Sequence, residues 1–135
     1  VEIETLPGYM PMRCDDVMAD RFKKTMVPMV GEDAYRQIGH RTGSTDMGDL
    51  SQVMPILHPY IGGARGTGHG ADWEIVDKNL AYVAPAKALA AMVVEMLGDG
   101  AAGARDVLAR AKPPMTRQSF LAFQRSLARR EVYQG

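Results

Sequence analysis

The chain has 135 residues, and its 16 basic and 16 acidic side chains balance to a formal net charge of zero. This length is enough for one domain with a modest core. The charge balance excludes an overall field that attracts nucleic acid or an anionic membrane, so the expected partner is a small molecule or another protein. One cysteine, Cys14, excludes an internal disulfide, and ten methionines suit a reducing compartment, which favours the cytoplasm.

The chain opens on Val1 rather than Met and enters a strand-like pattern at once. Val/Glu/Ile/Glu alternation predicts a strand over residues 1–5 with one face buried. The sequence shows neither a leader pattern nor an apolar run long enough to span a bilayer, and we interpret its start as a cut through a larger protein. Proline and glycine in residues 6–11 end the strand, which predicts a crossing between two structural units.

Short helices are predicted before Pro55. Asp15 or Asp16 is the expected cap of the first, and Thr45 and Asp46 are among the candidate caps of the last. The predicted ranges are 16–25, 32–38 and about 46–53.

A brief apolar strand with a proline near its end is predicted over residues 56–61. A glycine-dense loop follows over residues 62–70, and residues 73–76 are predicted to be extended. Such a loop after a strand also suits phosphate binding. However, no helix follows directly and no Gly-Lys-Ser/Thr string is present, which disfavours that interpretation.

A long helix is predicted from Pro85 to Leu97, with Gly98 ending it. It carries charges only at Lys87 and Glu95, so most of the helix is expected to be buried. Its apolar stripe, spaced by three and four residues, consists of Val83, Ala86, Ala90, Val93 and Leu97.

Two further helices are predicted in the tail, over residues 101–112 and from the cap Thr116 through Leu127. Pro113 and Pro114 separate them. The charged residues near the end are interpreted as a solvated face rather than an anion site: Arg125, Arg129, Arg130 and Glu131.

Histidine is the commonest metal ligand, and the sequence has three. His69 lies between two glycines, which lets its ring be aimed into a cleft, although an ordinary surface-loop histidine fits the same pattern. For His58, beside Pro59, a core or rim histidine is the favoured interpretation. His40 lies in a predicted connector. Because catalytic zinc usually takes three protein ligands, any site needs residues from elsewhere.

Several strings in this order resemble the C-terminal part of M20-family metallopeptidases and amidohydrolases, in the branch that contains aminobenzoyl-glutamate hydrolase. The resemblance spans nearly the whole chain, including the tail at residues 130–133. The strings are Pro7-Gly8-Tyr9-Met10-Pro11, Gly43-Ser44-Thr45-Asp46-Met47-Gly48-Asp49, Pro55-Ile56-Leu57-His58-Pro59-Tyr60, His69 and Ala84-Pro85-Ala86-Lys87-Ala88-Leu89-Ala90.

This resemblance implies an α/β fold: the C-terminal part of a zinc-peptidase-like catalytic domain, with few strands flanked by several helices. Residues 1–6 would be the last strand of an inserted dimerisation domain, and residues 7–135 would belong to the catalytic domain. The full-length protein would be a homodimer. The missing half of the catalytic domain would leave apolar surface exposed on the long helix, where its sheet packs, and so cause oligomers or aggregation.

The resemblance also implies two divalent metal ions, commonly zinc, and hydrolysis of amide bonds in N-acyl amino acids or small peptides. His69 matches the last metal ligand of the family. The general-base glutamate and the other ligands would lie in the missing N-terminal half, so no catalytic residue is expected in this chain and the isolated chain should be inactive. Thr45 and Asp46 would form part of the active-site wall, although an ordinary helix cap explains Asp46 equally well. His58 would lie in the substrate pocket.

A competing function is a non-catalytic binding module, in which the glycine-rich loop and the basic tail recognise an anion or a partner chain. The upstream sequence separates the two functions. A His-x-Asp string and a Glu-Glu pair are expected there for the hydrolase, and neither is expected for the binding module.

Overall fold

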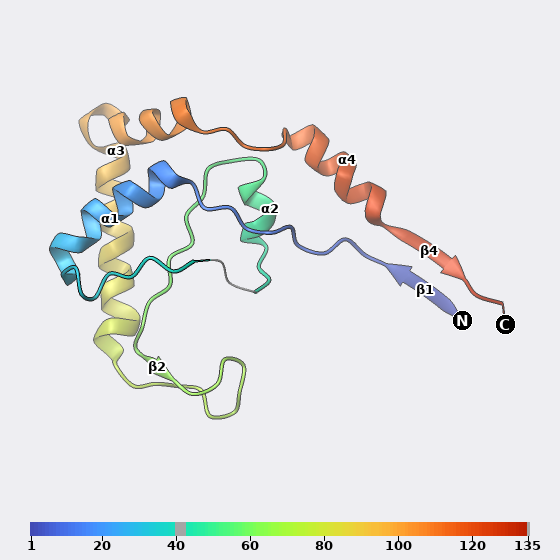
Figure 1. Cartoon of the computed structure of the whole chain (residues 1–135), viewed down its shortest axis with the longest axis horizontal. Coiled ribbons are helices and arrows are strands. Elements are labelled where there is room, and N and C mark those ends of the chain that lie inside the picture. Colours follow the sequence, from blue (N-terminus) through green and yellow to red (C-terminus); the bar gives the residue numbers. More distant parts are fainter. Residues whose placement is uncertain (40–42, 135) are drawn as a thin grey trace.

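The computed structural model describes residues 1–39 and 43–134. Within them the fold is mixed, with helices and two small antiparallel sheets. Figure 1 shows α1 packed beside α3 at one end of the molecule and β1 with β4 at the other, where both termini lie. From the N-terminus, the elements are β1 (Glu2–Thr5), α1 (Asp16–Val30), α2 (Met47–Ser51), β2 (Ala64–Arg65), β3 (Glu74–Ile75), the π-helical turn η1 (Asn79–Val83), α3 (Ala84–Arg110), α4 (Arg117–Leu127) and β4 (Arg129–Val132).

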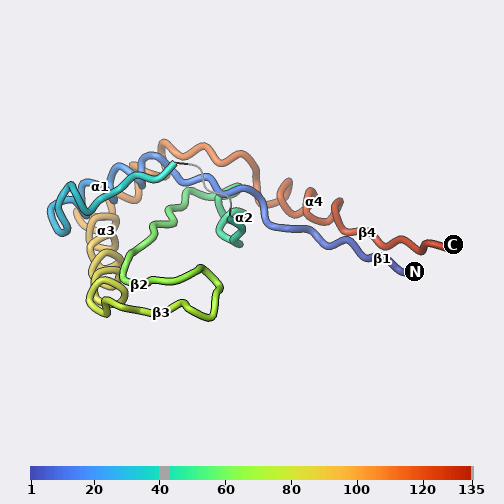
Figure 2. The backbone as a smooth tube through the Cα atoms, turned by 60° about the horizontal axis from the view of Figure 1, so that its bottom comes forward, coloured from blue at the N-terminus to red at the C-terminus, as the bar shows by residue number. Residues whose placement is uncertain are grey.

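The predicted N-terminal strand is confirmed as β1, and its partner is the unpredicted strand β4. The predicted buried face is wrong, because Val1 and Ile3 are 84% and 47% exposed in a ribbon of two strands with no other described element packed on it. The pairing is antiparallel, with Glu2 opposite Val132. The backbone amide of Tyr133 donates to the Val1 carbonyl at 2.8 Å, which extends the ladder. Arg130 on β4 forms an ion pair with Glu2 on β1, so one of the charged tail residues contacts the other strand of this two-stranded ribbon. Both views show this ribbon projecting away from α1 and α3 (Figures 1 and 2).

Helix α1 begins as the sequence predicts, because the Asp15 carboxylate accepts a hydrogen bond from the Met18 amide at 2.9 Å. It ends later than predicted, at Val30, and contains Pro28. Met26, only 5% exposed, belongs to this added part, so packing outweighs the proline there. Gly31, with φ of 83°, then ends the helix.

The helix predicted over residues 32–38 is wrong. The described backbone makes only a turn at residues 32–34 and then continues without regular structure. The Tyr35 ring lies 6.3 Å from the Phe22 ring, so this segment folds back along α1. The contact with α1, rather than a local helical spacing, determines its path.

Helix α2 confirms the short helix predicted near residues 46–53 and forms a polar junction between distant segments. The Gln52 side-chain amide donates to the Pro11 carbonyl at 2.9 Å, and the Gln52 carbonyl accepts from the Met115 amide at 2.9 Å. The Ser51 hydroxyl accepts from the Arg13 amide at 3.1 Å. Both side chains are buried and hydrogen-bonded, which joins three parts of the chain.

The strand predicted over residues 56–61 is also wrong, since the structure describes all six residues and assigns none to a strand. Ile56 is buried and its carbonyl accepts from the Asp15 amide at 2.8 Å, so the segment is held against the start of α1. Pro59 lacks a backbone donor, which opposes a regular ladder. The extended segment predicted at residues 73–76 is confirmed as β3, paired with β2.

Helix α3 consists of two helical halves, as predicted, with a break at residues 98–101. Asp99 and Ala101 there have φ of 49° and 66°. The predicted burial of the first half is wrong: Leu89, Val93 and Leu97 are 68%, 56% and 62% exposed. Sequence spacing defines an apolar face but does not supply the element that covers it.

The helical stretch Asn79–Arg110 also corrects the expectation that no run is long enough to span a bilayer. It contains an 18-residue window with a mean hydropathy of 1.6, so by length and composition it is apolar enough to cross a membrane.

In the part of the chain that the structure describes, the buried apolar side chains are Met26, Ile56 and Val107. The molecule therefore has little core for its size.

Candidate metal-binding loop

The β2–β3 hairpin carries the loop that contains His69. Ala64 pairs with Ile75, and the Arg65 guanidinium lies 2.5 Å from the Glu74 carboxylate. Gly66 has φ of 95°, and a Cβ atom there would collide with the Asp72 carbonyl oxygen. Glycine is therefore required where the two sides of the hairpin meet.

Asp72 fixes the conformation of this loop. Its two carboxylate oxygens each accept from the Thr67 amide at 3.1 Å, and the Thr67 hydroxyl donates to one of them at 3.4 Å. The Gly70 amide donates to the Thr67 carbonyl at 2.7 Å, which closes a turn around residues 67–70. His69 lies in that turn and is exposed. The only signal for Asp72 in the sequence is its short distance from His69 along the chain.

The left-handed backbone falls on His69 itself, with φ of 65°, rather than on the flanking glycines. Histidine is among the residues enriched in this conformation outside glycine. The turn therefore presents the imidazole to solvent at the end of the hairpin. The His69 imidazole is therefore accessible to a metal ion whose other ligands come from outside the described residues.

Asp46 occupies the cap position of α2, but its side chain makes no capping hydrogen bond. The Thr45 hydroxyl donates to the Asp46 carboxylate at 3.2 Å and accepts from the Met47 amide at 3.4 Å. The expected side-chain cap at Asp46 is therefore not formed. Its carboxylate is exposed and contacts its neighbour Thr45.

Within residues 43–49, Asp49 is the carboxylate that makes long-range contacts. The sequence analysis did not identify it as a candidate site residue. It accepts from the Met10 amide at 2.9 Å and from the Gln124 side-chain amide at 3.3 Å. Its place in the first turn of α2, near the capping residues, is the only local signal. Asp49 thus positions α2 against the segment after β1 and against α4.

His58 is half-buried, and its ring lies 5.3 Å from the Tyr60 ring at 39°. Its Nδ1 atom is buried and makes no hydrogen bond within the described residues. This environment fits a rim histidine packed against an aromatic ring. His40 lies outside the described residues.

The structure does not bring the predicted site residues together in one cavity. Both views place α2 and the β2–β3 hairpin on the same side of α3 (Figures 1 and 2). Over residues 1–39 and 43–134, no group of three or more histidine, cysteine, aspartate or glutamate side chains is arranged to hold a metal ion. His69 therefore needs ligands from outside this set to form a catalytic zinc site.

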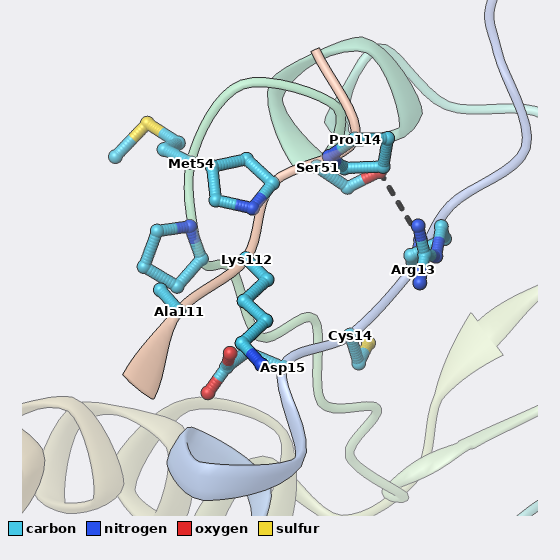
Figure 3. Close-up of a pocket in the computed structure, with 10 residues that line it drawn as sticks. Arg13, Cys14, Asp15, Ser51, Met54, Ala111, Lys112 and Pro114 are labelled. Carbon is cyan, nitrogen blue, oxygen red and sulfur yellow. Dashed lines mark hydrogen bonds between the residues drawn. The ribbon is translucent and has the colours of Figure 1, made fainter. Parts of the chain in front are cut away.

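Two hollows lie elsewhere. One, of about 70 Å³, is shown in Figure 3, where the Arg13 amide donates to the Ser51 hydroxyl. The acidic Asp15 and the basic Lys112 both line this hollow, so its lining carries charges of both signs. The other, of about 490 Å³, lies between α1 and α3 beside Arg21. Neither hollow is lined by His69, His58, Thr45 or Asp46.

Comparisons of the chain with protein-family models, with curated proteins and with solved structures found no match.

Proposed function

We propose that the chain is the C-terminal portion of a dinuclear metal-dependent amidohydrolase that cleaves amide bonds in N-acyl amino acids or small peptides. The observation that carries this proposal is the order of the M20-like strings, which includes a histidine between two glycines at residue 69. The geometry of the hairpin is compatible with that role. His69 is exposed in a fixed turn at the end of the hairpin.

His69 would bind one metal ion in this proposal, and the remaining ligands and the general-base glutamate would come from an N-terminal part of the protein. Two bound ions, zinc by the family resemblance, would supply Lewis-acid chemistry for amide hydrolysis. Asp72 would hold the turn so that the imidazole keeps its direction. Thr45, Asp46 and His58 would contribute to the wall of the substrate site.

The proposal has consequences for the whole protein. The 135-residue chain would be inactive on its own, because a catalytic metal site needs more ligands than it provides. The complete enzyme would be a cytoplasmic homodimer. Residues 1–6 would end its dimerisation domain, and in this chain β1 pairs with β4 of the proposed catalytic domain.

Metal stoichiometry tests the proposal. Zinc binding is measured by competition with a chromogenic chelator on the 135-residue chain and on the protein extended upstream in its reading frame. Two ions per extended chain, with one site weakened by His69→Ala, are expected. Absence of zinc binding by the extended protein, or an upstream sequence without the His-x-Asp and Glu-Glu strings, would overturn it.

The binding-module alternative has weaker support. A phosphate-cradling loop leads into a helix N-terminus, whereas residues 62–70 lead into β3. Arg65, the cation of that loop, already forms an ion pair with Glu74. The alternative gains support only if the extended protein binds no metal.

A further inference from the structure

Residues 62–97 form one structural body, which contains the β2–β3 hairpin, η1 and the first half of α3. The Asp77 amide donates to the Gly63 carbonyl at 3.0 Å, and the Asp77 carboxylate accepts from the Leu80 amide at 2.9 Å. A Cβ atom on Gly63 would lie 2.7 Å from the Asp77 carbonyl oxygen, so the hairpin is in backbone contact with the segment that begins η1. We call this unit the hairpin body. The turn that carries His69 is therefore fixed to the first half of α3.

Two irregular segments connect the hairpin body to the rest of the chain. Residues 57–61 precede it and have no regular secondary structure. Residues 98–101 follow it and form the break in α3, where Asp99 and Ala101 have φ of 49° and 66°. Hinges typically consist of a few residues of this kind, at the ends of elements, because they absorb changes in backbone angle. Left-handed angles are costly for residues other than glycine, so contacts elsewhere must hold the bent arrangement.

One ion pair and one loosely packed contact hold the hairpin body against α1. Arg21 on α1 pairs with Glu95 at 2.5 Å. Within the described residues, this is the only side-chain hydrogen bond or ion pair that joins the hairpin body to another element. Beside this pair, α1 and α3 leave a hollow of about 490 Å³ between them. Protein interiors contain few voids larger than a water molecule, so the contact between these two helices is loosely packed.

The shape of α3 converts a small rotation at the break into a larger displacement of the hairpin. Figure 1 shows the hairpin at one end of the first half of α3 and the break at the other end. Residues 84–97 span about 20 Å at the helical rise, so a rotation of about 15° at the break moves their far end by about 5 Å. His69 would move with the hairpin, relative to α2.

We propose that the hairpin body turns about its two connecting segments, and that the Arg21–Glu95 ion pair is the latch that holds it against α1. When this pair opens, Arg21 keeps its second partner, Asp106, on the far side of the break, so α1 stays with the second half of α3. The hairpin body then rotates away from α1 and carries His69 to a different position relative to α2. This inference does not rest on the proposed metal chemistry, since it concerns the backbone that carries the turn and not what the turn binds.

The test measures distances between two spin labels by double electron–electron resonance, on the 135-residue chain in a Cys14→Ser background. The cross pair joins Lys24→Cys on α1 to Val76→Cys on the hairpin body, and the inner pair joins Val76→Cys to Val93→Cys within the hairpin body. All three native residues are exposed. We expect a broader distance distribution for the cross pair than for the inner pair. Glu95→Ala removes one partly exposed ion pair, so it should raise the population of displaced distances in the cross pair about threefold and leave the inner pair unchanged.

The matched control is Glu74→Ala, which removes the ion pair with Arg65 inside the hairpin body and should leave the cross pair unchanged. A cross pair as narrow as the inner pair, with and without Glu95→Ala, would overturn the proposal. So would an inner pair that broadens as much as the cross pair, an equal response to Glu74→Ala, or loss of the helical circular dichroism signal in Glu95→Ala. Zinc binding is measured separately, so failure of the hinge and failure of the proposed function are distinguishable.

Discussion

The guanidinium of Arg21 on α1 lies 2.5 Å from the carboxylate of Glu95 on the first half of α3. A second nitrogen of the same guanidinium lies 2.8 Å from Asp106, on the second half of α3. The two carboxylates are on opposite sides of the helix break at residues 98–101. One side chain on α1 therefore links the two halves of α3.

Arg21→Ala should loosen the second half of α3. Without the guanidinium, Glu95 and Asp106 lose their common partner, and both are partly exposed, so the main effect is a local opening rather than global unfolding. Hydrogen exchange should become faster over residues 102–108, and Lys23→Ala, an exposed change on the same helix, should leave it unaltered. Unchanged exchange in Arg21→Ala would contradict this role for Arg21.

Stability should fall on acidification partly because of Asp106. Hydrogen bonds from Arg110 and from Arg21 lower the pKa of Asp106 below its ordinary value. The unfolded state then binds more protons than the folded state as pH falls, so this contribution is present above the ordinary aspartate pKa and is lost as pH falls through the lowered one. Asp106→Asn should be less stable than wild type near neutral pH, and the difference should shrink on strong acidification. A difference that is constant with pH, in urea titrations, would exclude this linkage.

Gly48→Ala should destabilise the junction around α2. A Cβ atom at residue 48 would collide with the Met10 carbonyl oxygen, so the backbone of one segment must move. We expect a loss of about 2 kcal/mol in the free energy of unfolding, the scale of overpacking in a packed site. Gly8→Ala is the matched control, because a Cβ there meets nothing within 4 Å. Equal stability of the two variants would show that α2 does not form this junction.

Asp72→Ala should release the turn that carries His69. The Thr67 amide loses its carboxylate acceptor. Its exchange should become roughly tenfold faster, which corresponds to one hydrogen bond of typical net strength. Asp33→Ala, in an exposed turn outside the hairpin, serves as the control. Protection of the Thr67 amide that survives Asp72→Ala would mean that the turn is held by other contacts.

Local signals predicted part of this fold. The cap at Asp15 and the helix stop at Gly98 are confirmed because each acts through its own neighbouring backbone. Thr116 likewise forms the cap of α4, where its hydroxyl accepts from the Ser119 amide at 3.1 Å. Strand β4 was missed because its partner β1 lies at the opposite end of the sequence, and pairing over that distance leaves no local pattern.

The candidate site was less predictable for the same reason. Flanking glycines predicted that the His69 ring can be aimed into a cleft, whereas the structure leaves His69 exposed in a turn and lining neither of the two hollows. The contacts of Asp49 with Met10 and Gln124 depend on tertiary structure and could not be read from spacing. The exposed face of α3 shows the same limit, because hydrophobic spacing identifies a face but not its cover.

The decisive experiment for the proposed function counts the zinc ions bound by the protein extended upstream, with and without His69→Ala. We expect two ions per chain for the wild type and a much weaker second ion for the variant, with unchanged folding by circular dichroism. No bound zinc, or two ions held equally tightly by both proteins, would rule out His69 as a metal ligand.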